Sequence, residues 1–323
     1  MKTTVGVLFS SMFFVLATDV SAQAAGQAVN DLFNRAAGTQ LGLDWTEVNA
    51  DAQISGNRIV GNSPFDLGWS VHTTFNASWS QTAARMTWAM NGGGGDRVSI
   101  ICGADTSTWS AVEVRIGDND GDGLADRVWW NAAVNAGAWF SGASFANLTT
   151  PLAAGEATVW FTNGGNTVNL ELRDSAGANP QTFSASGILA MPPSGTRVGF
   201  GYYNNPFIDD FQAWTGNANG LVCTLTRART NQPASLLVTH ASPNAPVLVA
   251  FSTIGGGPIP TAIGNVLLTE PVVLLGAFSA AATGRVDVPM GTVPPGLTGA
   301  TFWVQAFAGT ANVLSNGFSM TVL

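Results

Sequence analysis

The chain has 323 residues and is acidic and sparsely charged, with 12 Lys and Arg against 20 Asp and Glu, a formal net charge of −8 and only 10% charged residues. This balance argues against nucleic acid and against an anionic membrane surface as partners. A chain of this length is typical of two domains. Its short runs rich in Val, Thr, Phe and Trp, separated by glycine-rich turns, predict an all-β fold.

The N-terminus has the features of a secretory leader. Lys2 gives a positive start, an apolar run extends from Val5 to Ala17, and small residues around Ala22 to Ala24 offer a cleavage site. The run is shorter than the roughly 20 apolar residues that cross a bilayer. We therefore expect residues 1–24 to be a signal peptide, no membrane insertion, and a secreted or extracellular protein, with the periplasm or the cell surface as alternatives.

Residues 25–216 form the first expected domain, a sandwich of short strands separated by Gly- and Asn-rich turns. Val112, Val114 and Ile116 alternate with Glu113 and Arg115, which predicts a strand with one buried and one solvated face. The expected strands include 58–60, 69–75, 84–90, 98–102, 111–116, 127–131, 157–162, 167–173, 196–202 and 208–214.

Between two of these strands, segment 118–126 reads DNDGDGLAD. Carboxylates at alternate positions, then a glycine and a further acid, match the loop pattern that surrounds Ca²⁺ with oxygen atoms. The sequence predicts a weak, structural Ca²⁺ site whose ligands are Asp118, Asp120, Asp122, the backbone carbonyl of Leu124, and Asp126. The last position of the pattern is Trp129 instead of a bidentate glutamate, so one ligand residue is missing. An ordinary Asp/Asn/Gly turn is the alternative.

Trp129 and Trp130 follow this loop directly. Neighbouring residues of a strand point to opposite faces, so we expect one of the two rings to be exposed. An exposed indole is a flat apolar platform with one N–H donor, which suits a sugar ring. The two are therefore candidate ligand-binding residues; the alternative is that both pack in cores.

Motifs for catalysis are sparse. A glycosidase needs two carboxylates across the scissile bond, and the nearest candidates are Glu113 and Glu171. Each is followed two residues later by an arginine, Arg115 or Arg173, which favours solvated ion pairs on a wet sheet face. Whether the protein is an enzyme is uncertain, and we expect that it is not.

The two cysteines, Cys102 and Cys223, have two possible states. In an exported protein they can form a disulfide; the alternative is two buried thiols.

The two ends of the first domain resemble a known family. Segment 31–48, beginning Asp31-Leu32-Phe33-Asn34, and the closing segments Val198-Gly199-Phe200-Gly201-Tyr202 and Ile208-Asp209-Asp210-Phe211 resemble concanavalin A-like (laminin-G-like) jelly-roll domains of secreted bacterial proteins. The resemblance implies a jelly roll whose first and last strands lie side by side. Asp31 with Asp209 or Asp210 would then form a second possible metal site, with turn capping as the alternative. That fold hosts lectins, hydrolases, lyases and adhesion modules.

Residues 217–232 read as a polar linker, and residues 233–323 as a second domain. Seven short expected strands in that space have the rhythm of an immunoglobulin-like β-sandwich. At Ser242-Pro243-Asn244-Ala245-Pro246 and Leu314-Ser315-Asn316-Gly317 it resembles the C-terminal β-domains of exported proteins of planctomycete-type bacteria.

These observations together predict a secreted, non-catalytic binding or adhesion protein. The first domain is expected to bind a glycan or another cell-surface ligand, with structural Ca²⁺. The alternatives are a polysaccharide-cleaving glycoside hydrolase or lyase of the jelly-roll type, and a purely structural cell-surface module.

Overall fold

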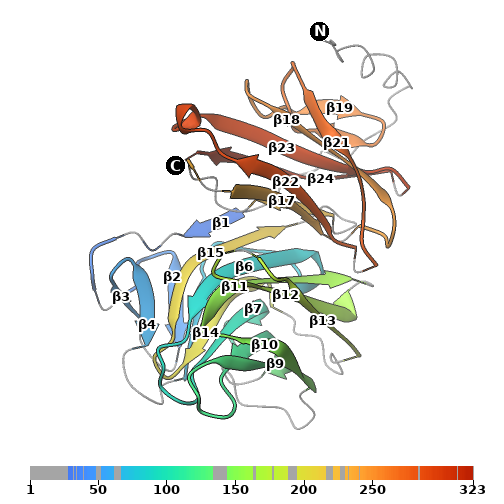
Figure 1. The fold of residues 1–323 in the computed structure, drawn as a ribbon. Coiled ribbons are helices and arrows are strands. Elements are labelled where there is room, and N and C mark those ends of the chain that lie inside the picture. The colour runs from blue at the N-terminus through green and yellow to red at the C-terminus, as the bar shows by residue number, and fades with distance from the viewer. Residues whose placement is uncertain are drawn as a thin grey trace. The chain divides into compact units, whose positions relative to one another are not determined.

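The computed structural model describes residues 28–31, 33, 35–38, 40–48, 52–61, 67–133, 144–162, 165–176, 178–187, 195–215, 221–225, 230–231, 233–239, 241–282, 284–310 and 312–322. The expected signal peptide, 1–24, lies outside the described residues. The chain divides into two compact units, which we describe separately (Figure 1): Gln27–Thr215, and the described part of Gly216–Leu323. Among the described residues no helix is long and apolar enough to cross a membrane.

The first unit is a sandwich of two antiparallel sheets. In its described residues one sheet has eight strands in the order β13-β12-β11-β6-β15-β4-β3, with β1 also paired to β15, and the other has seven in the order β10-β9-β8-β7-β14-β5-β2. The strands of the eight-stranded sheet are β1 (Ala28–Asp31), β3 (Ala52–Ser55), β4 (Arg58–Gly61), β6 (Thr82–Ala89), β11 (Ala154–Thr162), β12 (Thr167–Asp174), β13 (Gln181–Ser186) and β15 (Phe207–Thr215). Those of the seven-stranded sheet are β2 (Trp45–Val48), β5 (Leu67–His72), β7 (Arg97–Asp105), β8 (Ser110–Gly117), β9 (Ala125–Ala133), β10 (Ser144–Leu152) and β14 (Arg197–Tyr203). A 3₁₀ turn, η1, spans Trp79–Gln81.

The core of this unit lies between the two sheets, where the alternation in the sequence predicts it. Val112, Val114 and Ile116 of β8 point into it, and from the opposite sheet Leu170 and Leu172 of β12 do the same. Burial of such side chains stabilises the fold by about 1.5–3 kcal/mol each. Glu113 and Arg115 therefore lie on the other side of β8, on the face turned away from the sandwich core, which we call the outer face of the seven-stranded sheet.

The second unit is a smaller β-sandwich. Its described strands form three sheets, β16-β17-β22, β21-β18-β23-β24 and the hairpin β19-β20. Leu236, Val238, Val247 and Val304 are among the residues of its own core. The strands are β16 (Val222–Leu225), β17 (Pro233–Thr239), β18 (Pro246–Ser252), β19 (Ile259–Thr261), β20 (Gly264–Val266), β21 (Val273–Ser279), β22 (Val286–Thr292), β23 (Thr301–Ala308) and β24 (Val313–Thr321), with a 3₁₀ turn, η3, at Pro295–Leu297. The predicted all-β architecture of two consecutive sandwiches is confirmed.

The predicted linker needs one correction. Segment 217–232 contains β16, which pairs with β17 from Val222↔Thr239 to Leu225↔Leu236. Leu221 and Cys223 are buried in the core of the second unit, so this stretch is part of the sandwich and not wholly a connection. Its polar composition concealed a short strand with alternate apolar residues.

The two cysteines are buried thiols, not a disulfide. Cys102 belongs to the core of the first unit and Cys223 to that of the second. Burial raises the pKa of both thiols far above the ordinary value. In the structure each thiol acts as a small apolar side chain within its own core.

Candidate functional site

The outer face of the seven-stranded sheet carries polar and aromatic side chains in a regular pattern. Because β8 and β9 pair in the register Glu113↔Asn131 and Arg115↔Trp129, these four residues form a block on two neighbouring strands. A small apolar cluster of Trp69, Val71, Ile101, Ala104 and Ala111 adjoins it, separate from the main core.

Glu113 is the most unusual residue of this face, because its side chain is 0% exposed. Its Oε1 accepts hydrogen bonds from Nε of Arg115 at 2.8 Å and Nε1 of Trp69 at 3.3 Å, whereas its Oε2 has no partner. The expected ion pair with Arg115 is present, but the expectation that it is solvated is wrong. Apolar side chains from other strands of the sheet bury this ion pair. Because these side chains are not part of β8, its sequence could not show that the pair is buried.

The bond from Trp69 depends on a glycine. Trp69 lies on β5, and β14 and β7 separate that strand from β8. A Cβ atom at Gly201 of β14 would lie 2.9 Å from Cδ1 of Trp69 and 2.5 Å from Oγ of Ser99. The missing side chain leaves room for the indole to lie across the sheet and reach Glu113.

Asn131, opposite Glu113, is 1% exposed, and neither its Oδ1 nor its Nδ2 has a hydrogen-bond partner. A buried polar group without a partner costs about 1–3 kcal/mol, and folded proteins contain few of them. Two acceptor atoms and one amide donor group are thus unpartnered on two neighbouring strands. Sequence reasoning did not identify Asn131, since only the register of β8 and β9 places it beside Glu113.

The tryptophan pair differs from the expectation of one exposed ring. Trp130 is 2% exposed and belongs to the sandwich core, and Trp129 is 8% exposed on the outer face. The exposed aromatic residue here is Phe145 of β10, 58% exposed and opposite Trp129. In the sequence, an aromatic residue among the polar residues of an edge strand could have indicated this exposed ring. Trp129 and Trp130 lack the open ring face on which their predicted role was based.

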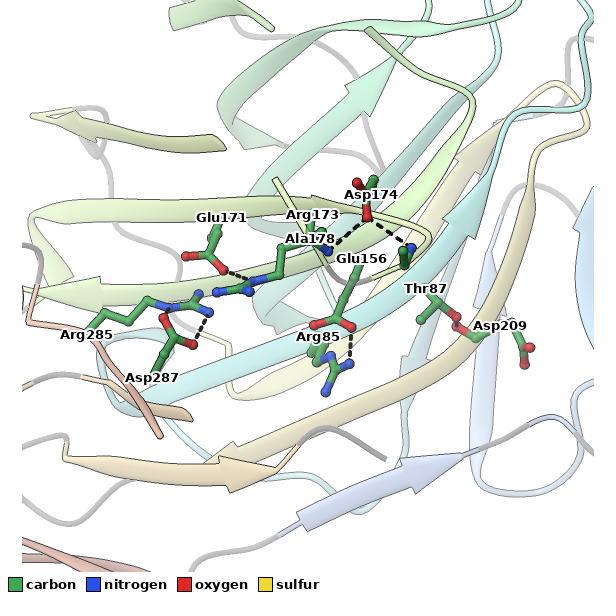
Figure 2. Close-up of polar contacts among 11 residues, drawn as sticks. Arg85, Thr87, Glu156, Glu171, Arg173, Asp174, Ala178, Asp209, Arg285 and Asp287 are labelled. Atoms are coloured by element: carbon green, nitrogen blue, oxygen red, sulfur yellow. Dashed lines mark hydrogen bonds and ion pairs between the residues drawn. The ribbon is translucent and has the colours of Figure 1, made fainter. Parts of the chain in front are cut away.

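Glu171, the other predicted carboxylate, lies far from Glu113 in the topology. It is on β12 of the eight-stranded sheet, alternates with the core residues Leu170 and Leu172, and pairs with Nε of Arg173 at 2.5 Å (Figure 2). The sandwich core therefore separates the two carboxylates. They cannot flank one glycosidic bond, which a two-carboxylate mechanism requires.

The acidic loop connects β8 to β9 and is built around Asp118, which is 0% exposed. Its carboxylate accepts backbone N–H groups of Gly121 at 2.6 Å, Gly123 at 2.9 Å and Gly95 at 3.2 Å. Burial by itself raises the pKa of Asp118, but these N–H groups outweigh it and lower the pKa. Gly121 and Gly123 have φ of 88° and 85°, a left-handed conformation that favours glycine.

Three of the expected Ca²⁺ ligands come together. One oxygen atom from each of Asp118, Asp120 and Asp122 lies within 4.8 Å of the others, which fits an ion bound at about 2.3–2.6 Å from each oxygen. Asp126 is not part of this group; its Oδ1 accepts the N–H of Asn119 at 2.7 Å. The carboxylates present suit Ca²⁺, with one ligand residue fewer than the sequence predicts.

The second predicted metal site, at Asp31, Asp209 and Asp210, has a different role. β1 and β15 lie side by side as the resemblance implies, with Asp31 opposite Phe211. However, Oδ2 of Asp31 accepts from Arg35 at 2.9 Å and from Nε1 of Trp45 at 2.8 Å. Among the described residues Asp31 joins no group of carboxylates that could surround a metal ion, which distinguishes it from Asp118.

A pocket of about 240 Å³ lies on the other sheet, and sequence reasoning missed it. Its carboxylates have protein donors: Glu156 pairs with Arg85 and Asp174 accepts the N–H of Ala178 at 2.9 Å (Figure 2), and Asp209 accepts the N–H of Asp210 at 2.9 Å. Among the described lining residues of this pocket, Nε1 of Trp88 is the buried polar atom without a partner. The outer face, where a carboxylate oxygen and a whole carboxamide are unpartnered, is the stronger candidate. The lining residues are Arg58, Thr87, Trp88, Ala89, Gly155, Glu156, Asp174, Ser175, Phe207 and Asp209.

No family model and no curated protein matches the chain. Solved structures of similar fold include the basic winged bean lectin with Tn-antigen, 11% identical with a TM-score of 0.43, covering 60% of this chain and 99% of that chain. Another is lectin I from Ulex europaeus with the methyl glycoside of α-L-fucose, 11% identical with a TM-score of 0.42, covering 59% and 98%. A third is arcelin-5, a lectin-like defense protein from Phaseolus vulgaris, 9% identical with a TM-score of 0.41, covering 59% and 99%. The likeness concerns the fold alone and assigns no site.

Proposed function

We propose that the first unit is a glycan-binding module whose binding surface is the outer face of the seven-stranded sheet around Glu113 and Asn131. One observation carries this proposal: Oε2 of Glu113 and both polar atoms of the Asn131 side chain are buried without partners. A sugar hydroxyl both donates and accepts hydrogen bonds. Adjacent hydroxyls of one ring therefore suit a carboxylate oxygen next to a carboxamide, once the side chains that cover these buried atoms move aside for the ligand.

The surroundings support this chemistry. Arg115 and Trp69 hold the Glu113 carboxylate from one side, which fixes the direction of its remaining oxygen. The exposed ring of Phe145 supplies an apolar surface for the carbon face of a sugar. The site thus combines a few oriented polar groups with one exposed aromatic ring.

Binding fits this surface better than cleavage. At the outward strand positions of this face that the structure describes, Glu113 is the only carboxylate, and it is held in an ion pair. Hydrolysis of a glycosidic bond by the common route needs a second one. The protein is therefore proposed to be a secreted, non-catalytic binding protein.

Ca²⁺ has a structural part in the proposal. Asp118, Asp120 and Asp122 would hold the ion in the loop that leads from β8 into β9. An ordered loop fixes the register of the strand that presents Trp129 and Asn131. Weak Ca²⁺ sites of this type occur in extracellular modules, which agrees with the proposed extracellular location.

The test is binding of the full chain to a panel of polysaccharides by glycan array and calorimetry. Asn131→Ala should weaken binding about tenfold, as expected for loss of about 1.4 kcal/mol of hydrogen bonding. Asn169→Ala is the matched control: it is a buried strand asparagine of the other sheet, where it accepts from Ser184. No binding to any glycan, or equal effects of the two variants, contradicts the proposal.

A further inference from the structure

Arginine and aromatic side chains alternate along the outer face of the seven-stranded sheet. The Cζ atom of Arg97 lies 5.5 Å from the ring centroid of Tyr203 and 5.1 Å from that of Trp129. The Cζ atom of Arg127 lies 5.9 Å from the ring of Trp129 and 4.7 Å from that of Phe145. We call this series, Tyr203-Arg97-Trp129-Arg127-Phe145, the arginine–aromatic ladder.

The ladder crosses several strands, and a glycine makes this possible. Arg97 of β7 pairs with Gly117 of β8, and Gly117 pairs with Arg127 of β9. A Cβ atom at Gly117 would lie 2.5 Å from Cγ of Arg97. Because Gly117 has no Cβ atom, the aliphatic part of the Arg97 side chain lies over β8 and its guanidinium reaches the ring of Trp129.

This face concentrates positive charge on an acidic chain. Arg97, Arg115 and Arg127 occupy outward positions of three consecutive strands, β7, β8 and β9. At the outward positions of these strands that the structure describes, Glu113 is the only carboxylate. Burial, and then the like charge of Arg115, lower the pKa of Arg97, whereas Tyr203, Asp118 and Glu113 act in the opposite direction. The adjoining loop carries four carboxylates, Asp118, Asp120, Asp122 and Asp126, so the positive charge is confined to the strands of this face. On a chain of net charge −8, these three arginines thus gather on the strands of one sheet face, beside the acidic loop.

Arg127 is partly exposed, as is Arg97, whereas Arg115 is buried. Its Nε donates to Oδ1 of Asn147 at 3.0 Å and its Nη1 to Oδ1 of Asn119 at 2.9 Å. Both acceptors are neutral amides, which orient the guanidinium without neutralising its charge. Within the described residues Arg127 has no acidic partner.

We propose that the glycan bound at this face is acidic, a polysaccharide bearing carboxylate or sulfate groups; this inference rests on the proposed glycan-binding function. The planar guanidinium of Arg127 binds an acidic group with paired hydrogen bonds. The exposed ring of Phe145 beside it stacks on the sugar that carries this group. The unpartnered atoms of Glu113 and Asn131 bind neutral hydroxyls.

Calorimetry with the full-length protein tests the inference. The probes are polygalacturonate, a sulfated galactan, a neutral galactan, and a DNA oligonucleotide. We expect binding to at least one of the two acidic polysaccharides, and a difference between them identifies whether carboxylate or sulfate is preferred. Binding should be weaker at 0.5 M than at 0.05 M NaCl, because salt screens exposed charges.

Arg127→Gln should weaken binding of the acidic polysaccharide about tenfold or more, and Arg127→Lys, which keeps the charge without the planar fork, should fall between. Arg58→Gln is the matched control and should bind as the wild type does. Arg58 also packs on an aromatic ring, with its Cζ 3.5 Å from the centroid of Phe207, but on the other sheet. A circular dichroism spectrum identical to that of the wild type verifies that each variant is folded.

The outcomes separate the two proposals. Equal or tighter binding of the neutral galactan overturns the acidic-ligand inference and leaves glycan binding intact. Binding to DNA as tight as to the acidic polysaccharides also overturns it, since the face would then attract any polyanion. No binding to any polysaccharide overturns both.

Discussion

Replacement of Arg115 by methionine tests whether the buried ion pair on the outer face is as described. Methionine keeps an unbranched side chain but removes the positive charge. Glu113 would remain fully buried with Nε1 of Trp69 as its one remaining donor. Removing one partner of a buried ion pair costs about 3–5 kcal/mol, because a charge is left uncompensated. The free energy of unfolding of the first unit should fall by about this amount.

A second variant distinguishes lost packing from a stranded charge. When Glu113→Leu accompanies Arg115→Met, no buried charge remains, and replacement of a whole buried pair by apolar side chains is often close to neutral. The double variant should therefore be more stable than Arg115→Met alone. Its glycan binding should still be lost, since the proposed carboxylate ligand is gone.

Urea unfolding followed by tryptophan fluorescence measures these differences, because ten of the 11 tryptophans precede residue 216 and report on the first unit. Arg35→Met is the control: Arg35 pairs with Asp31 at 2.9 Å, but its side chain is 39% exposed. Exposed pairs contribute about 0–1 kcal/mol. If Arg115→Met costs no more than this control, or if the double variant is no more stable than the single one, the description of a buried charge pair is wrong.

Three further measurements test other parts of the structure. At 10 mM Ca²⁺ the free energy of unfolding of the first unit should rise by about 1.4–2.7 kcal/mol for a dissociation constant of about 10⁻³ to 10⁻⁴ M, and its melting temperature should rise with it. A chelator or Asp120→Asn should abolish this stabilisation, whereas Asp126→Asn should keep it. Equal effects of both variants would show that Asp126 also binds the ion. Burial lowers the pKa of His72 from 6.5, so the unfolded chain binds more protons between the lowered value and 6.5, and stability should fall as pH decreases from 7.5 to 5.5; an unchanged slope in His72→Gln, measured by urea midpoints, contradicts this. A thiol reagent at pH 8 should label Cys102 and Cys223 only in denaturant, and a denatured chain that remains unlabelled would instead contain a disulfide.

The sequence predicted what depends on local pattern. The alternation of Val112, Val114 and Ile116 with Glu113 and Arg115 identified a strand and its two faces, because side-chain direction in a strand has a period of two. The carboxylates of the acidic loop were found because Ca²⁺ ligands in such loops lie close together in sequence. Even there, the structure groups Asp118, Asp120 and Asp122 without Asp126, whose Oδ1 accepts the N–H of Asn119, a detail of the folded turn.

What the sequence could not supply was strand order and register. Glu113 was read as solvated because nothing on β8 shows that Trp69, Val71 and Ile101 gather beside it from other strands. For the same reason one ring of the Trp129 and Trp130 pair was expected to be exposed. Alternation tells which face a side chain is on, whereas the exposure of that face depends on residues distant in sequence.

Three glycines show how this face is encoded. Gly117, Gly199 and Gly201 occupy outward positions of β8 and β14, and a Cβ atom at each would lie within 2.6 Å of another atom. At Gly199 the obstacle is the backbone carbonyl of Ser70, at 1.9 Å, so this glycine permits close approach of two strands. At Gly117 and Gly201 the empty volume admits Arg97 and Trp69, whose side chains cross neighbouring strands. The outer face thus owes its charge cluster to missing side chains as much as to charged ones, and a search for catalytic or ligand motifs, which looks for residues that are present, does not detect it.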